Sequence, residues 1–161
     1  MHLRETLLFL HIGSVMVLAA AVGVSVYCKA IAIRTASATA ARALLVAAGG
    51  AIRLLGLPAS LVMILTGALL VQHANGAWRY DEPWIVGAMV LWLASAVVGA
   101  RMHAPRSRAA RAHLDKLETA DEPVDDTLRQ IVRSGRLASV LDTAFLAGMV
   151  AFMVFKPTFG M

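Results

Sequence analysis

The sequence predicts an all-α fold, a transmembrane four-helix bundle with long cytoplasmic helix extensions. Of its 161 residues, 59% are hydrophobic and only 16% are charged. The mean hydropathy of +0.71 is typical of membrane proteins rather than soluble domains. The run from Leu54 to His73 contains no Asp, Glu, Lys or Arg. At about 1.5 Å per residue it is long enough to cross the roughly 30 Å hydrocarbon core of a bilayer. We expect one transmembrane domain, residues 1–161, with spans at about 6–32, 54–73, 84–103 and 137–155 and a cytoplasmic loop at 104–136.

The first span, 6–32, contains one charged residue, Lys29, close to its end. A cleavable signal peptide is the alternative interpretation. The apolar run is longer than the roughly 7 to 15 residues of a signal core, however, and Cys28 follows Tyr27 rather than the small residue of a lipoprotein cleavage site. We therefore expect an uncleaved first helix.

The second helix is expected to be longer than its span. Thr35 or Ser37 can cap it, and the helical pattern continues from about Ser37 to His73. Gly49-Gly50 is expected to loosen the helix. Pro58 is expected to kink it, because proline lacks the amide hydrogen of the helical bond.

The connection between the second and third spans is expected to be a short turn. Asn75-Gly76 is a turn signal, and Pro83 suits the first turn of the next helix. Trp78, Tyr80 and Trp84 are typical of the aromatic belt at a membrane surface.

The hydrophilic segment before the last span is expected to form two amphipathic extensions of the third and fourth helices. We expect these at Ser107–Leu117 and Pro123–Arg136, with Asp121 as the N-cap of the second.

The basic residues indicate the orientation. Twelve of the 15 lysines and arginines lie around the first and third connections, and only Arg4, Arg79 and Lys156 lie elsewhere. By the positive-inside rule, the two basic connections face the cytoplasm and both termini lie outside it. The basic residues lack interleaved stacking aromatics, which favours anionic membrane lipids over a nucleic acid as their partner.

His11 and His73 are the candidate cofactor ligands. The topology places both toward the outer face, on different helices. Two imidazoles are what the iron of haem b needs as axial ligands, and the apolar surroundings would keep the porphyrin dry. A bound metal ion is not expected, because no carboxylate or thiol joins the pair. The alternatives are that His11 bonds a neighbouring helix and that His73 is an interfacial residue.

Asp142 is the one acidic residue within the spans. A lone carboxylate in hydrocarbon is protonated or paired, and Arg53 is the nearest basic group by depth. We expect Arg53 and Asp142 to form a structural intramembrane pair. A proton or ion site is the alternative, although no second acid accompanies it. His103 and His113 are expected at the surface.

No catalytic residue is assigned. The sequence has no nucleophile motif, no phosphate-binding glycine-rich loop and no pair of carboxylates arranged for catalysis. The single cysteine, Cys28, excludes an internal disulfide and a CxxC site. The sequence therefore favours a protein that is not an enzyme.

Several short motifs resemble those of a family. His11 in the first helix, Arg53-x4-Pro58, Thr66-Gly67 and the ending Met153-Val-Phe-Lys-Pro157 resemble a group of bacterial four-helix predicted integral membrane proteins of unknown function. This resemblance covers nearly the whole chain and implies a multi-pass protein of the bacterial inner membrane.

A more distant similarity concerns the first helix. A histidine followed by small residues is similar to copper-resistance-D-type membrane proteins and to haem-associated four-helix membrane oxidases of porphyrin synthesis. Those groups usually carry Trp-x-Gly-Gly after the histidine, whereas this chain has Val15-Met-Val-Leu-Ala-Ala.

Three functional hypotheses follow. The first is a non-catalytic accessory or structural subunit of a larger bacterial membrane complex, or a bundle that associates with itself. The second is a b-type haem protein in electron transfer or oxidoreductase chemistry, with His11 and His73 as ligands. The third is a small transporter that uses Asp142. The expected partners are membrane lipids and other membrane subunits or a second copy of the chain.

Overall fold

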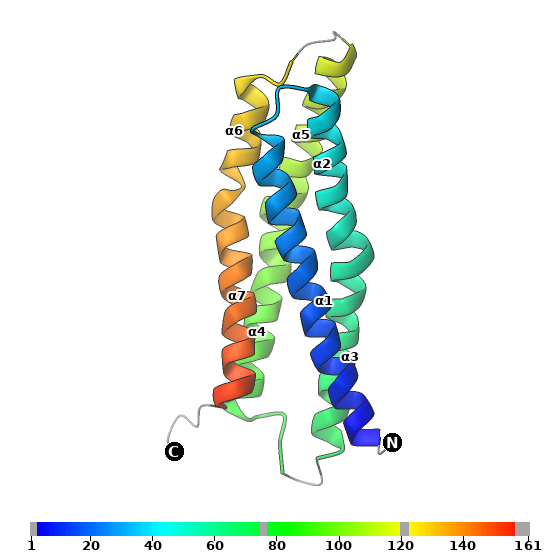
Figure 1. Ribbon diagram of the computed structural model, residues 1–161. Coiled ribbons are helices and arrows are strands. Elements are labelled where there is room, and N and C mark those ends of the chain that lie inside the picture. Colours follow the sequence, from blue (N-terminus) through cyan, green and yellow to red (C-terminus); the bar gives the residue numbers. More distant parts are fainter. Residues whose placement is uncertain (1–2, 75–76, 120–122, 157–161) are drawn as a thin grey trace.

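The computed structural model describes residues 3–74, 77–119 and 123–156, and every regular element in these ranges is a helix. The helices form four long rods, each long and apolar enough to cross a membrane (Figure 1). The expected all-α four-helix bundle is confirmed. The rods are α1 (Leu3–Ala32); α2 (Ala38–Gly50), η1 (Ala51–Gly56) and α3 (Leu57–Gln72) in one run; α4 (Pro83–Val98), η2 (Gly99–His103) and α5 (Ala104–Thr119) in one run; and α6 (Asp126–Ser134) followed by α7 (Arg136–Phe155).

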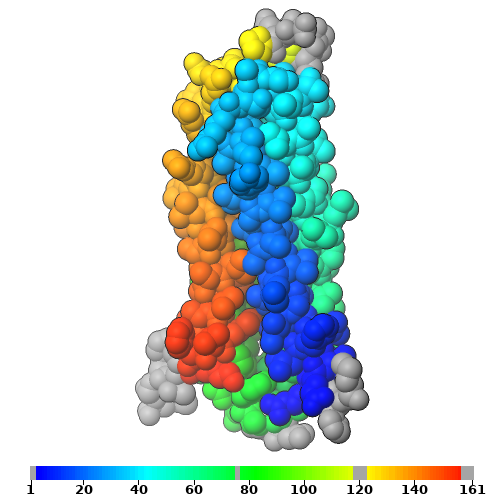
Figure 2. Space-filling view, in the orientation of Figure 1, coloured from blue at the N-terminus to red at the C-terminus, as the bar shows by residue number. Residues whose placement is uncertain are grey.

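The connections between the rods gather at two ends of the molecule (Figure 1). The start of α1, the end of α7 and the connection between α3 and α4 lie at one end. We call it the tryptophan end because Trp78 and Trp84 are there. The opposite end, the basic end, holds the α1–α2 and α5–α6 connections. Figure 2 shows α1 running between α6–α7 on one side and α2–α3 on the other.

The second and third rods each contain one wide helical turn, η1 and η2, in which a backbone N–H bonds to the carbonyl five residues earlier. η1 ends two residues before Pro58, and η2 ends two residues before Pro105. A proline cannot donate the usual helical bond and its ring crowds the carbonyl four residues earlier, and a wide turn relieves both problems. Gly49-Gly50, expected to loosen the helix, lies in regular α-helix immediately before η1, and the expected kink at Pro58 stays a prediction. The second wide turn lies inside the expected third span and was not predicted.

Side chains cap the two helices that begin at the basic end. Ser37 accepts a hydrogen bond from a backbone N–H in the first turn of α2 at 3.3 Å, as expected. Asp125 accepts the N–H of Leu128 at the start of α6 and a bond from His113 Nε2, both at 2.9 Å. The bond from the Leu128 N–H does most to lower the pKa of Asp125, and the bond from His113 lowers it further. Asp125 therefore remains a carboxylate. His113, expected at the surface, is partly buried by this contact. Asp121, the expected cap, lies outside the described residues.

Two buried clusters hold the rods together. The first cluster lies in the part of the bundle formed by α3, α4 and α7, which we call the membrane half. There, Met63, Ala88 and Met149 pack against each other. At the basic end, Leu114 of α5 and Leu128 of α6 are fully buried among alanines of α1, α2 and α5. The hydrophilic segment therefore forms two helices close to the expected extensions, and these helices have a buried core of their own.

Glycines allow α4 and α7 to approach each other closely. A Cβ added at Gly87 would lie 2.9 Å from ring atoms of Phe152, and one added at Gly148 would lie 2.8 Å from Leu91 Cδ1. Gly87 and Gly148 are on different helices, so each helix offers a small residue where the other offers a large one. Small residues drive helix association in a membrane because they maximise van der Waals contact.

Candidate functional site

His11 lies on α1 and contacts α3. Its Nδ1 is 2.9 Å from the carbonyl oxygen of Met63 and 3.3 Å from Thr66 Oγ1. A carbonyl only accepts hydrogen bonds, so Nδ1 carries a hydrogen and donates it. The ring also lies over Gly67, where an added Cβ would be 3.1 Å from His11 Cε1. The expectation that His11 bonds a neighbouring helix is confirmed.

His73 caps the end of α3 and is exposed. Its Nδ1 donates to the carbonyl of Leu69 at 2.9 Å, which holds the imidazole against its own helix. Both imidazoles therefore contact α3, His11 at the level of Gly67 and His73 about 9 Å further along the helix axis. Ligation of haem by this pair stays a prediction.

Asp142 on α7 is bound by two side chains from the third rod. His103 Nε2 lies 2.8 Å from Asp142 Oδ2, and Ser95 Oγ donates to Oδ1 at 3.1 Å. The structure does not bring Arg53 and Asp142 together, so the expected partner of Asp142 is corrected to His103. His103, expected at the surface, is only 21% exposed. A role of Asp142 in transport stays a prediction.

The roles of Lys29 and Ser95 at this site were not predicted. Lys29 of α1 attracts Asp142 electrostatically, so this carboxylate is influenced by groups from two other rods, the first and the third. Ser95 was identifiable from the sequence as a small residue in the third span, and His103 as its last residue. Among the described residues, no group of three His, Cys, Asp or Glu side chains is placed to hold a metal ion.

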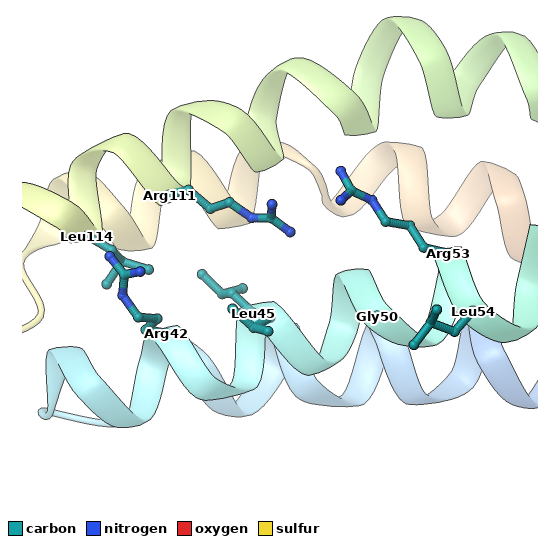
Figure 3. A pocket seen from close by; sticks show the side chains of 8 residues that line it. Arg42, Leu45, Gly50, Arg53, Leu54, Arg111 and Leu114 are labelled. Atoms are coloured by element: carbon teal, nitrogen blue, oxygen red, sulfur yellow. The ribbon is translucent and has the colours of Figure 1, made fainter.

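A groove lined by arginines lies near the basic end, between α2–η1 and α5 (Figure 3). It has a volume of about 410 Å³. Arg42 and Arg53 approach it from the second rod and Arg111 from α5, and Figure 3 shows the guanidinium groups of Arg53 and Arg111 directed into the space between these helices. Arg42 forms an ion pair with Asp115. The remaining lining residues are apolar or glycine: Leu45, Val46, Gly50, Leu54 and Leu114.

Aromatic rings and cations gather at the tryptophan end. The rings of Trp78 and Trp84 are 5.8 Å apart in an edge-to-face arrangement. The ammonium group of Lys156 lies 4.5 Å from the Trp78 ring and 5.5 Å from the Trp84 ring, and Arg4 lies 5.7 Å from Trp78. Lys156 ends α7 in the left-handed backbone conformation, with φ at 42°. These cation–π contacts join the ends of α1 and α7 to the connection between α3 and α4.

The family described as predicted integral membrane protein (DUF2269) matches residues 5–157 of the chain. The chain belongs to this family. No curated protein and no solved structure matched it. Membership in DUF2269 confirms the expected resemblance to an uncharacterised family of membrane proteins. The more distant similarity to copper-resistance-D-type proteins stays a prediction.

This DUF2269 chain is a multi-pass integral membrane protein with four apolar rods. Two polar side chains in its spans make contacts between rods: His11 joins α1 to α3, and Asp142 joins α7 to the third rod. In the arginine groove, by contrast, the side chains of Arg53 and Arg111 are directed toward an open space.

Proposed function

We propose that the protein is a non-catalytic structural subunit of the bacterial inner membrane, which packs against a second copy of itself or against another membrane subunit. The observation that carries this proposal is a pair of small residues on the outer face of α1. Ala19 and Gly23 are exposed and four residues apart, so they lie on one face of the helix. No atom of another helix lies within 4 Å of the position that a Cβ would take at Gly23. Small residues at this spacing let two membrane helices approach closely.

A second face of the same kind lies on α7. Ala144 and Ala147 are exposed, whereas Gly148 beside them is used inside the bundle against Leu91. The two faces lie on different rods, so each can meet a separate neighbour. This arrangement favours a protein whose contacts extend beyond a single bundle.

The use of polar side chains within the bundle supports a structural role. Besides the His11 and Asp142 contacts, the indole Nε1 of Trp92 donates to Ser60 Oγ at 2.8 Å and joins α4 to α3. Interhelical bonds of this kind fix the mutual position of helices in lipid, where few other polar partners are available. A rigid bundle is what a docking subunit requires.

Adding bulk to the α1 face is expected to weaken association. The double variant Ala19→Leu/Gly23→Leu holds partner helices apart, and we expect a roughly tenfold weaker self-association, equivalent to about 1.4 kcal/mol. Light scattering coupled to size-exclusion chromatography in mild detergent, at several protein concentrations, measures it. Val17→Leu/Val24→Leu is the matched control, because these valines are also exposed on α1 but lie to the side of the small pair. A wild-type protein that stays monomeric at all concentrations would rule out self-association.

We also propose that the basic end faces the cytoplasm and that both termini lie outside it. The arginine-rich connections at the basic end support this orientation, because cytoplasmic loops of membrane proteins carry an excess of Lys and Arg. The cluster of Trp78, Trp84 and Lys156 then lies at the outer surface, where aromatic belts occur.

Haem b binding by His11 and His73 is the second candidate. It is favoured by the Nδ1 bonds to the carbonyls of Met63 and Leu69, because histidines that ligate a metal usually donate their other ring N–H in this way. Both Nε2 atoms would then be available as axial ligands, and the haem would supply one-electron chemistry.

Haem binding predicts a Soret band in the purified protein. We expect the band to shift or disappear in His11→Ala and His73→Ala, because each variant removes one axial ligand. Absorption spectra of wild type and both variants, purified in parallel, measure this. A wild-type spectrum without a Soret band, after expression with added haem precursor, would eliminate this candidate.

A further inference from the structure

We propose that the arginine groove binds the phosphate group of an anionic phospholipid. The groove has room for such a group, because its volume of about 410 Å³ lies within the roughly 300–1,000 Å³ of small-ligand sites. Its ligand groups come from two different rods, Arg53 from η1 and Arg111 from α5. A ligand held between them would join the second rod to the third.

The charges in the groove favour an anion. Among the residues that the structure describes, neither Arg53 nor Arg111 forms an ion pair or a hydrogen bond, and no acidic side chain lines the groove. Arg42, the third cation, has Asp115 as a partner. Guanidinium groups offer planar paired donors that match the oxygens of a phosphate.

The backbone of α2 leaves space for one of these donors. A Cβ at Gly49 would lie 3.1 Å from Arg111 Nη2, so the guanidinium of Arg111 reaches across from α5 to the surface of α2 at this glycine. A larger residue at Gly49 would displace the arginine without changing the charge of the groove. Gly49 is therefore a positioning residue for Arg111.

The depth of the groove favours a lipid as the source of the phosphate. Arg53 lies about 28 Å along the helix from Gln72 at the tryptophan end, which is close to the thickness of a bilayer's hydrocarbon core. Leu54, next to Arg53, is 76% exposed and lies at the end of a stripe of exposed leucines on α3. The phosphate can thus meet the arginines while the acyl chains lie along this stripe, which continues through Leu57, Leu61 and Leu65.

Native mass spectrometry of the full-length, detergent-purified protein tests the proposal. The protein is titrated with phosphatidylglycerol, which is anionic, and in a separate experiment with phosphatidylcholine, in which the choline group offsets the charge of the phosphate. We expect wild type to retain phosphatidylglycerol, and Arg53→Gln/Arg111→Gln to bind it at least about tenfold more weakly, because two charge-assisted contacts are lost. Gly49→Val is expected to weaken binding in the same direction with all charges kept. Circular dichroism confirms that each variant is folded.

The matched control is Arg133→Gln/Arg136→Gln, which removes the same charge from exposed positions at the basic end but outside the groove. We expect it to retain the lipid like wild type. An equal loss in both double variants, or no loss in either, would overturn the proposal, because a general attraction of lipid to basic residues would then suffice. Displacement of phosphatidylglycerol from wild type by inorganic phosphate is expected, because both would occupy the same site. Binding of inorganic phosphate by wild type without any retention of phosphatidylglycerol would overturn the lipid as the source of the phosphate.

Discussion

Gly87→Val is expected to lower the thermal unfolding midpoint of the detergent-solubilised protein, with a loss of stability of about 2 kcal/mol. The reason is the contact between α4 and α7. A Cβ at this position would lie 2.9 Å from two ring carbons of Phe152 and 3.2 Å from a third. The ring packs against the buried cluster of the membrane half, so it cannot withdraw without opening that cluster. Differential scanning fluorimetry or circular dichroism measures the midpoint.

Gly13→Ala is the control for this experiment. No atom of another helix lies within 4 Å of the added Cβ, and alanine is a better helix former than glycine by about 1 kcal/mol. Its midpoint is expected to stay the same or to rise. Equal midpoints for wild type and Gly87→Val would show that α4 and α7 are not packed as described. Gly148→Ala is expected to have the smaller effect, because the atom it meets is the end of the flexible Leu91 side chain.

His103→Ala is expected to cost a similar amount, about 2 kcal/mol. It leaves Asp142 with Ser95 as its remaining hydrogen-bond donor in a site where both members of the pair are only about one fifth exposed. Leaving a buried polar group without one of its hydrogen-bond partners typically costs about 1–3 kcal/mol, and the expected loss lies within that range. Denaturant or thermal unfolding in lipid-free detergent measures the effect.

A double-mutant cycle tests whether the partner of Asp142 is His103, as in the structure, or Arg53, as depth in the membrane alone suggested. His103→Ala and Asp142→Ala are expected to be less destabilising together than the sum of their separate effects, by about 1 kcal/mol or more. Arg53→Ala, an exposed position, is expected to change stability by no more than about 0.5 kcal/mol and to be additive with Asp142→Ala. Coupling of Asp142 with Arg53 instead of His103 would contradict the structure.

The helices were largely predictable because hydrophobicity and length mark a membrane span. Expected spans at 54–73 and 137–155 correspond to the apolar parts of the second rod and to α7. Hydrophobicity does not mark where a helix ends beyond the membrane, but the amphipathic pattern does, and α5 and α6 lie close to the expected extensions at Ser107–Leu117 and Pro123–Arg136. Proline chemistry predicted a kink at Pro58 but not the form of the wide turn before it, and the same reasoning applies to Pro105.

The candidate site was harder to predict because counting residues gives height along a helix but not direction around it. Arg53 was chosen as the partner of Asp142 by height alone. The order of the rods and their rotation instead bring His103 to that carboxylate. The arginine groove required the same information, because Arg53 and Arg111 are far apart in the sequence and line one groove only through the packing of α2 against α5.

The equal lengths of α3 and α4, 16 residues each, have a consequence for the membrane that the protein inhabits. With the wide turns included, the two halves of the hairpin reach the first arginine of each rod after about 28 Å, from Gln72 to Arg53, and about 27 Å, from Pro83 to Arg101, so they prefer nearly the same bilayer thickness. A thicker bilayer would have to thin around the protein, and a thinner one would make the hairpin tilt, each at a cost of a fraction of a kcal/mol per ångström. The protein is thereby matched to one thickness of lipid by two independent stretches of chain.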